Sequence, residues 1–409
     1  MNKDKATLRS SGIWSTILLG TAALMLVISV VSAPEPAFQA SLHALKLWWN
    51  IVFPALLPFL VLVEMINAYG WSHGMGVLLE PMMRKIFHLP GSGGTVLITG
   101  MIAGFPAAAQ LSAEMVKNNE LTAAEAGRLT AMAHFCNPMT ILVVIGGGLL
   151  HQPEAGYFLL AIHWISGLLA AWTYSPKSKN TGRANLKRSI YTSMAVGQQK
   201  GTSLLLQAAK AAARARSRDG RSFGKLLGES VTRSVQTLMM TGGFIMIFAV
   251  MVNVLSDPLS SNIIPFIAAG LLEVHIGSQS ITEGIFTSPG LQLSLLSAVL
   301  AWSGISAQLQ SLSGLKSHGS VKWSVFAFKR LVHAAYAFGL TLLFWKPAAS
   351  MTLSVLPAFG VVPHEALQSD QHFSLWNKFP ELFQWQVIAS IVLTAMFWAI
   401  SRYIIRRND

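Results

Sequence analysis

The sequence has little charge and almost no cysteine. Only 11% of its 409 residues are Asp, Glu, Lys or Arg, whereas soluble domains average about 25%. The single cysteine, Cys136, excludes an intramolecular disulfide and a CxxC metal or redox site. The motifs HExxH, GxSxG, Walker A and GxGxxG are also missing from the sequence. These absences exclude a soluble enzyme and a disulfide-stabilised secreted domain, and we expect no catalytic residue, no metal and no cofactor.

Long apolar runs make up most of what is present. Apolar and aromatic residues account for 52% of the chain, and the mean hydropathy is +0.50. A helix needs about 20 apolar residues to cross the core of a bilayer. The chain is therefore predicted to be an all-α, polytopic membrane protein with ten crossings. The predicted segments are 13–32, 51–68, 95–116, 121–137, 139–151, 157–174, 236–255, 291–310, 323–345 and 385–402.

Positive charge is concentrated in one part of the chain. The formal net charge is +13, and residues 177–233 contain 13 Lys or Arg against 2 acidic residues, a net charge of +11. Cytoplasmic loops of membrane proteins are rich in Lys and Arg. We therefore expect residues 176–222 to form a basic cytoplasmic loop that contacts anionic lipid headgroups, with both termini cytoplasmic. Protein docking on this loop is an alternative, and we expect no nucleic acid partner.

Short sequence matches recur in the same order in two halves of the chain. Residues 78–80 (LLE) are matched by 271–273, and residues 103–107 (AGFPA) by 303–307 (SGISA). The charge pattern lets the two halves begin on opposite membrane faces, which predicts two inverted repeats with broken helices and re-entrant hairpins. The predicted parts are an N-terminal transmembrane helix at 1–37, a first repeat at 38–175, the basic loop at 176–222, and a second repeat with a C-terminal transmembrane helix at 223–409.

Glycine and proline interrupt several apolar segments. Lipid cannot satisfy the backbone groups that such breaks release, so broken helices indicate a packed bundle or a watery cavity. The N–H groups that begin a half-helix can hold a carboxylate, although close packing of a glycine is the alternative. We predict that the substrate is bound by Gly104, Phe105 and Pro106 at the first break, by Ser303, Gly304, Ser306 and Gln308 at the second, and by Asn137, which could instead be a plain helix terminator.

Acidic side chains within apolar segments are costly and therefore suggest function. We predict a coupling or polar-network role for Glu80, Glu273 and Glu283. Residues 262–281 are predicted to form a re-entrant hairpin, and the polar cluster around Glu283 suits its tip. The alternatives are helix caps and interfacial carboxylates held by a nearby base such as Arg84.

Basic side chains within apolar segments allow two interpretations. Arg128 and Arg330 are predicted to pair with an anionic substrate or, alternatively, to anchor helices at the membrane interface. The intramembrane histidines His134, His163 and His333 are candidates for proton relay or are hydrogen-bonded residues of the bundle.

Four stretches of the first half resemble a known family. They are LKLWWNIVFPALL at 45–57, LLEPMMRKIFHLP at 78–90, GSGGTVLITGMIAGFPAAA at 91–109 and AEAGRLTAMAHFCNP at 124–138. They resemble the YlbJ-type sporulation integral membrane proteins, also called stage V sporulation proteins. Relatives of that family carry the nucleoside-recognition Gate domain and are related to concentrative nucleoside transporters. The resemblance is strongest over 38–175 and weaker in the second half, where Phe-Pro of the first break becomes Ile305-Ser306.

The resemblance implies a function that the residues alone do not give. It implies export of dipicolinic acid, a small polar anion, from the mother cell across the outer forespore membrane by a secondary transporter or facilitator. A cation-coupled, nucleoside-type transporter and a non-transporting membrane scaffold for spore assembly are the alternatives. The expected partners are an anionic small-molecule substrate, the lipid bilayer, and either a second copy or other sporulation membrane proteins.

Overall fold

The computed structural model describes residues 16–17, 20–21, 23–175, 203–256, 263–313, 315 and 321–355. Within these ranges the regular elements are all helical, and no strand occurs there. The prediction of an all-α protein is confirmed. The first half contains α2 (Pro34–Leu47), η1 (Trp48–Val52), α3 (Phe53–Ala68), α4 (Trp71–Lys85), α5 (Gly93–Ala103), α6 (Phe105–Lys117), α7 (Ala123–Met132), η2 (Thr140–Leu149) and α8 (Pro153–Thr173). The second half contains α10 (Leu204–Asp219), α11 (Phe223–Ser256), α12 (Ile263–Leu272), α13 (Val274–Glu283), α14 (Pro289–Trp302), α15 (Gly304–Ser313) and α16 (Trp323–Val355).

Four stretches in the described ranges are long and apolar enough to cross a membrane. They are Pro34–Ala68, Pro153–Thr173, Phe223–Leu255 and Pro289–Ser313. Shorter apolar helices occur at Ala23–Ser32, Gly93–Ala103 and Thr140–Leu149. Large apolar side chains such as Trp49, Leu62 and Phe328 are exposed on the outside, as lipid-facing residues are. The assignment of ten crossings stays a prediction, and its last segment, 385–402, lies outside the described residues.

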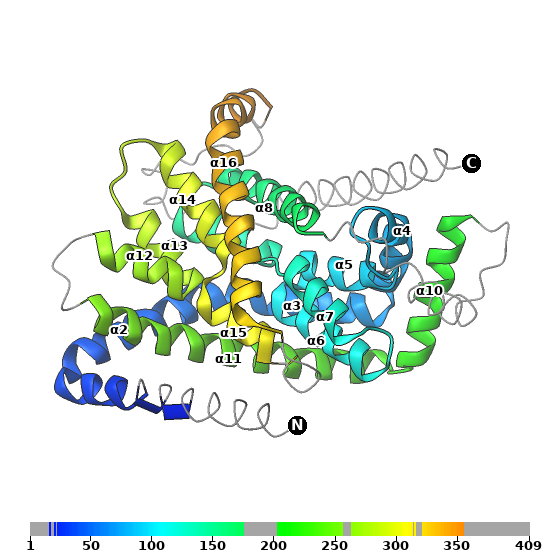
Figure 1. Ribbon diagram of the computed structural model, residues 1–409, viewed down its shortest axis with the longest axis horizontal. Coiled ribbons are helices and arrows are strands. Elements are labelled where there is room, and N and C mark those ends of the chain that lie inside the picture. The colour runs from blue at the N-terminus through cyan, green and yellow to red at the C-terminus, as the bar shows by residue number, and fades with distance from the viewer. Residues whose placement is uncertain are drawn as a thin grey trace, which may run out of the picture.

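A long pair of helical stretches lies along one side of the molecule. α2, η1 and α3 run beside α11, which is one continuous helix (Figure 1). The indole Nε1 of Trp48 donates a hydrogen bond to the Leu238 carbonyl at 3.0 Å. Gly242 allows this contact, because a Cβ at that position would lie 2.6 Å from the Trp48 ring. Near the other end of the pair, Arg233 donates to the Glu64 carboxylate at 3.1 Å.

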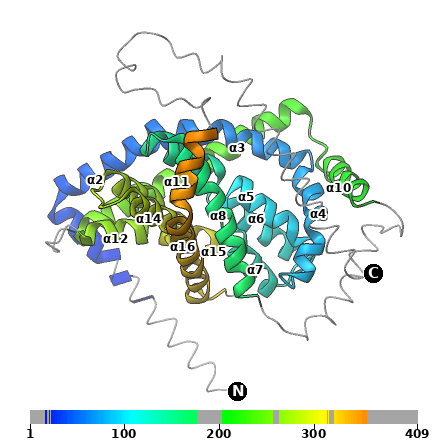
Figure 2. The ribbon, with the colours of Figure 1, turned by 90° about the horizontal axis from the view of Figure 1, so that it is seen from above.

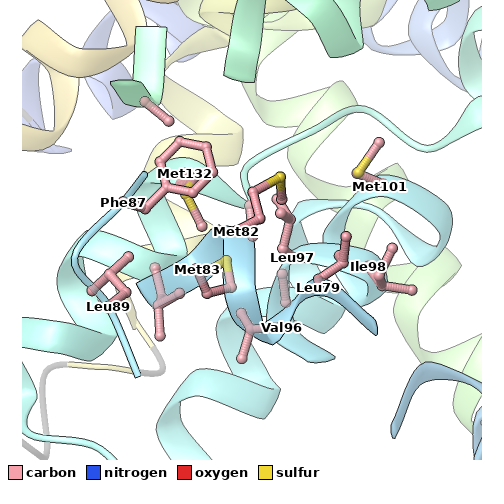
Figure 3. Close-up of a cluster of buried hydrophobic side chains, with 14 of the residues drawn as sticks. Leu79, Met82, Met83, Phe87, Leu89, Val96, Leu97, Ile98, Met101 and Met132 are labelled. Atoms are coloured by element: carbon pink, nitrogen blue, oxygen red, sulfur yellow. The ribbon is translucent and has the colours of Figure 1, made fainter. Parts of the chain in front are cut away.

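A methionine-rich core joins α4, α5 and α7. The side chains of this core meet between the three helices and the loop that follows α4 (Figure 3). Small residues bring α4 and α5 close together, because a Cβ on Gly94 would lie only 2.6 Å from the Gly76 carbonyl oxygen. The core includes Leu79, Met82, Met83, Phe87, Leu89, Val96, Leu97, Ile98, Met101 and Met132.

α10 lies at the end of the molecule beside α4 (Figure 2). Gly70 has a positive φ of 82°, and a Cβ there would lie 2.2 Å from the Ala212 carbonyl oxygen. α10 ends at Gly220, which is left-handed with φ 62°. The described part of the predicted basic loop is therefore a helix packed on the first half of the chain, whereas residues 176–202 lie outside the described residues.

Two helices are broken where the sequence predicts tips. α5 ends at Gly104, whose φ is 91°, and α6 begins at the next residue. α14 ends at Ser303 (φ 68°) and α15 begins at Gly304 (φ 75°). We call residues 104–106 the first tip and residues 303–306 the second tip. The inverted relation between the two halves stays a prediction.

The hairpin predicted at 262–281 differs in its details. Its helices α12 and α13 meet at Glu273, and a Cβ on Gly277 would lie 2.5 Å from the Gly270 Cα. Gly270 and Gly277 therefore pack the two helices together rather than break them. Glu283 was predicted at the tip, and this is wrong, because it ends α13 at the open end of the hairpin. Pro265 lies within the first turn of α12 and does not interrupt the helix.

Candidate functional site

The chain is unwound between α7 and η2. Residues 133–137, which we call the unwound segment, have no helical structure, although His134, Phe135 and Cys136 are almost completely buried. Asn137 ends the segment, and its Oδ1 accepts hydrogen bonds from the Thr140 N–H at 2.8 Å and the Thr140 hydroxyl at 3.1 Å. Asn137 therefore caps the start of the following helix and does not terminate α7, which ends at Met132; its role in substrate binding stays a prediction.

The first tip packs directly on the unwound segment. The Phe105 N–H donates to the Phe135 carbonyl at 2.8 Å, and the Phe105 ring stacks on the His134 ring with 4.7 Å between centroids. A Cβ on Gly104 would lie 3.1 Å from the Asn137 Cβ. Pro106 has no N–H, so two of the first positions of α6 have no free donor for a ligand. The first tip is thus a packing element as much as a possible anion site.

The second tip lies between the unwound segment and the α12–α13 hairpin. The Ser303 hydroxyl is 2.7 Å from His134 Nε2. A Cβ on Gly304 would lie 2.9 Å from the Glu273 Cα. Gln308 is completely buried; its amide nitrogen donates to the Trp302 carbonyl at 3.1 Å, and its Oε1 has no partner among the described residues. Ser306 is buried in the same half-helix.

Arg330 occupies the centre of the molecule on α16. It is the largest of the completely buried side chains, with 2% of its surface exposed. Its Nη2 donates to the Ala301 carbonyl and to His333 Nδ1, the latter at 2.7 Å, and its Nη1 lies 3.4 Å from the Ala131 carbonyl. Its Nε has no partner, and no carboxylate within the described ranges forms an ion pair with it. Arg330 is therefore not an interface anchor but a buried cation without an ion-pair partner in the described chain.

Two histidines extend the network around Arg330. Because His333 Nδ1 accepts from Arg330, its proton is on Nε2, which donates to the His163 carbonyl at 3.0 Å. His163 Nε2 accepts from the Cys136 N–H at 3.1 Å, and its Nδ1 has no partner among the described residues. Both rings are therefore neutral in this arrangement. They fix the positions of Arg330 and the unwound segment, which favours the hydrogen-bonded interpretation over proton relay.

Three predicted residues lie away from this centre. The Glu80 carboxylate pairs with Arg84 at 2.7 Å near the C-terminal end of α4, as the alternative for this residue states. Glu283 is exposed and accepts from Gln279 at 2.8 Å. Arg128 is half-buried and donates to the Phe87 carbonyl at 2.8 Å. The structure therefore gathers both tips, Asn137, Glu273 and Arg330, but not these three side chains.

Sequence reasoning missed two polar residues of the site. Ser311 lies 3.1 Å from His134 Nδ1, so that both nitrogens of this ring contact hydroxyls. His275 Nδ1 lies 2.9 Å from the Glu273 carboxylate, and both residues are buried. A serine in an amphipathic stretch carries no distinctive signal. The spacing of Glu273 and His275 could have drawn attention only if the turn between α12 and α13 had been located.

The arrangement is a closed, polar centre within an apolar bundle. It contains one buried cation, two breaks with left-handed residues, and several polar atoms without partners. No group of three or more potential metal ligands occurs within the described residues. Polar and charged groups buried within a membrane bundle are functional candidates.

Comparison with known proteins agrees with this architecture. The Gate family model, described as nucleoside recognition, matches residues 50–149. This range begins within η1, includes the first tip and ends with η2. The chain is 32% identical over 353 residues to the sporulation integral membrane protein YlbJ of Bacillus subtilis (strain 168), with 81% of this chain and 83% of that protein covered. The chain is thus an all-α, polytopic membrane protein that belongs to the YlbJ family of sporulation integral membrane proteins.

Proposed function

We propose that this protein is a membrane transporter for a small organic anion, with Arg330 as the residue that attracts the anion. The observation that carries the proposal is the burial of Arg330 without an ion-pair partner among the described residues. A charged side chain inside a membrane is costly and is usually paired or placed on a substrate pathway. Hydrogen bonds to carbonyl oxygens satisfy some of its N–H groups but leave its charge uncompensated. A bound anion would supply the missing charge.

Dipicolinate is the substrate that best fits both the site and the family. It is a planar dicarboxylate, and a guanidinium can bind a carboxylate through two parallel hydrogen bonds. Arg330 Nε has no partner among the described residues, so it is one of the donors available for such a contact. The relative in Bacillus subtilis is a sporulation integral membrane protein. We therefore infer export of dipicolinate from the mother cell across the outer forespore membrane, with both termini in the cytoplasm.

The two tips supply the parts that would move. The second tip is bonded to His134 of the unwound segment, and the first tip stacks on the same ring. Separation of the tips would open the centre around Arg330 to one side of the membrane. In broken-helix transporters, rocking of one repeat against the other opens the site to each side in turn. We extend this scheme to the two halves of the present chain.

Transport by purified protein in liposomes tests the proposal. Labelled dipicolinate is expected to enter liposomes that contain the wild-type protein and to exchange with unlabelled dipicolinate inside. Arg330→Gln removes the charge and is expected to lower the exchange rate by at least about tenfold, equivalent to about 1.4 kcal/mol. Lys329→Gln is the matched control, since the Lys329 ammonium lies over the Tyr174 ring at 5.0 Å, away from the Arg330 contacts.

The outcomes are distinct. Absence of dipicolinate movement under any ion gradient rejects the substrate. Equal exchange rates for wild type and Arg330→Gln reject the role of Arg330. Arg330→Lys is an informative third variant, because it keeps the charge and loses the planar fork. The exchange rate of Arg330→Lys is expected to lie between the rates of the wild type and of Arg330→Gln.

A nucleoside-type transporter is the second candidate, because residues 50–149 match a family model described as nucleoside recognition. A nucleoside offers hydroxyls and ring nitrogens rather than charge, so Gln308 and Ser306 would matter more than Arg330. Competition distinguishes the two functions. Saturable nucleoside uptake that follows a sodium or proton gradient and displaces dipicolinate would favour the second candidate.

A further inference from the structure

The turn between α12 and α13 contains a buried pair of titratable side chains. Glu273 is 2% exposed and His275 is 6% exposed. The Glu273 Oε1 atom lies 2.9 Å from His275 Nδ1, and its Oε2 accepts from the Ile276 N–H at 2.8 Å. His275 Nε2 is buried and has no partner among the described residues. Every polar side-chain atom of the pair is thus engaged except this one nitrogen.

Few other charges face the pair. The described helices packed against α13 are α11, α12, α14, α15 and η2, and four of them contain no acidic, basic, cysteine or tyrosine side chain. The exception, α11, has its charged residues Lys225, Glu229 and Arg233 in its first third. On α13 itself, Glu283 is exposed and bonded to Gln279. From the unwound segment, the Cys136 thiol lies within electrostatic range of Glu273.

The charge of the pair therefore depends on its own protons. With a neutral imidazole that donates from Nδ1, the pair has a charge of −1 from the Glu273 carboxylate. A proton bound at His275 Nε2 makes an imidazolium beside the carboxylate, and the pair becomes neutral. Burial in an apolar bundle makes each uncompensated charge costly. The pair can therefore exchange one proton, and the atom that receives it is His275 Nε2.

The second tip connects this pair to the proposed anion site. A Cβ on Gly304 would touch the Glu273 Cα at 2.9 Å, and Ala301, three residues earlier, accepts a hydrogen bond from Arg330. Glu273 is also the N-terminal cap of α13. Cap strength depends on the charge of the carboxylate and on its hydrogen bonds. A change of protonation at the pair therefore acts on the backbone that the second tip rests against.

We propose that the Glu273–His275 pair is the proton-coupling site of the transporter and that one proton moves with each anion. This inference rests on the proposed function at Arg330. In the loaded protein, one carboxylate of the anion neutralises Arg330, and the protonated pair is neutral. In the empty protein, the deprotonated pair has a charge of −1, which offsets the charge of Arg330 within the bundle although no ion pair joins the two. The charges of Arg330, the pair and the carboxylate bound at Arg330 then sum to zero at both stages in which the bundle rearranges, and the second carboxylate of dipicolinate is the further charge of the loaded state.

The proton step is balanced without any further reactant. A proton from water on the side where the anion binds forms the N–H bond at His275 Nε2. After the rearrangement, that bond breaks and the proton passes to water on the other side together with the anion. The structure thus predicts symport of protons and anions in the same direction.

Full-length protein in liposomes distinguishes coupling from transport. Exchange of labelled dipicolinate at equal pH reports on the anion site, and accumulation driven by a pH gradient reports on coupling. Wild-type protein is expected to accumulate dipicolinate when the side that holds it is acidic, and an internal pH dye is expected to report proton entry. His275→Gln keeps an N–H donor toward Glu273 but cannot bind a proton. It is expected to lose accumulation and proton entry while exchange remains measurable.

Two further variants complete the test. Glu273→Gln is expected to lose accumulation in the same way, whereas Glu283→Gln, on the exposed end of the same helix, keeps it. Exchange together with unchanged accumulation in His275→Gln overturns the coupling site and leaves the proposed function intact. Lack of exchange by the wild type rejects the proposed function.

If the wild-type protein does not exchange dipicolinate, infrared spectroscopy still tests whether His275 binds a proton. A pH difference spectrum of the purified wild-type protein is expected to contain imidazole bands that His275→Gln removes. Identical difference spectra of the two proteins overturn the inference.

Discussion

Ser303 of the second tip and His134 of the unwound segment are joined by a 2.7 Å contact between hydroxyl oxygen and Nε2. The two residues are 169 positions apart in sequence and both are completely buried. The contact is therefore a direct polar link between the two halves of the chain. It also places the second tip beside the ring on which Phe105 of the first tip stacks.

Removal of this link is expected to destabilise the closed arrangement. Ser303→Ala leaves a buried imidazole nitrogen without its partner, which costs about 1–3 kcal/mol. Thermal unfolding of the purified protein in detergent measures the loss. A double-mutant cycle with His134→Asn separates the interaction energy of the pair from the effects of each substitution alone. An interaction energy near zero would show that the contact does not stabilise the fold.

Gly304 is expected to tolerate no side chain. Gly304→Ala forces a Cβ to within 2.9 Å of Glu273 Cα and requires an alanine at φ 75°, so we expect a cost of about 1–3 kcal/mol. Gly339→Ala is the matched control, since it lies within helix α16 and a Cβ there has no atom within 4 Å. Alanine is expected to be neutral or stabilising by up to about 1 kcal/mol at this control position. Equal melting temperatures for the two variants would contradict the packing of the second tip.

Substitutions at two adjacent glycines of α11 are expected to have different effects on stability. Gly242→Ala places a methyl group 2.6 Å from the Trp48 ring, whereas Gly243→Ala meets nothing within 4 Å. The first substitution is expected to displace the indole from the Leu238 carbonyl and to cost about 1–3 kcal/mol. Tryptophan fluorescence, compared with that of a Trp48→Phe variant, reports the displacement. The contact between α2–η1 and α11 is disproved if both variants give the wild-type spectrum.

The end of α10 is expected to weaken in acid. Asp219 accepts hydrogen bonds from Arg221, and the Arg221 guanidinium holds the pKa of this carboxyl below its ordinary value. Because the folded-state pKa is depressed, the stabilisation is present above the unfolded value of about 3.9. It is lost as the pH falls through the lower, folded value. Amide hydrogen exchange at residues 216–221 is expected to accelerate in that window, and Asp219→Asn is expected to remove the pH dependence there.

Some parts of the site follow from sequence and others do not. Gly104 and Gly304 mark real breaks, because only residues that tolerate positive φ can reverse a chain so sharply within an apolar segment. The different environments of Arg128 and Arg330 cannot be read from the sequence, since both lie in apolar segments. Arg128 is half-buried and bonds to a loop carbonyl, whereas Arg330 is completely buried. Tertiary packing decides which face of each helix is covered.

The acidic residues illustrate the same limit. Glu80 and Glu273 occur in the same three-residue motif, yet Glu80 pairs with Arg84 inside a helix and Glu273 caps one. The polar cluster around Glu283 suggested a tip there. In the structure, Gly270 and Gly277 pack the two helices together, and the turn lies at Glu273. The apolar stretch 262–281 therefore located the pair of helices, and the polar residues after it did not locate the turn.

The close approach of Gly270 and Gly277 has a consequence for membrane insertion. α12 and α13 have 10 residues each, so each is about 15 Å long, half of the roughly 30 Å hydrocarbon core. Neither helix can cross alone, but the glycine contact lets them form a compact hairpin by themselves. The insertion machinery would then receive one unit instead of two spans. Both outer ends of this unit, Ile263 and Glu283, would emerge on the same face, and the hairpin would not change the orientation of the helices that follow it.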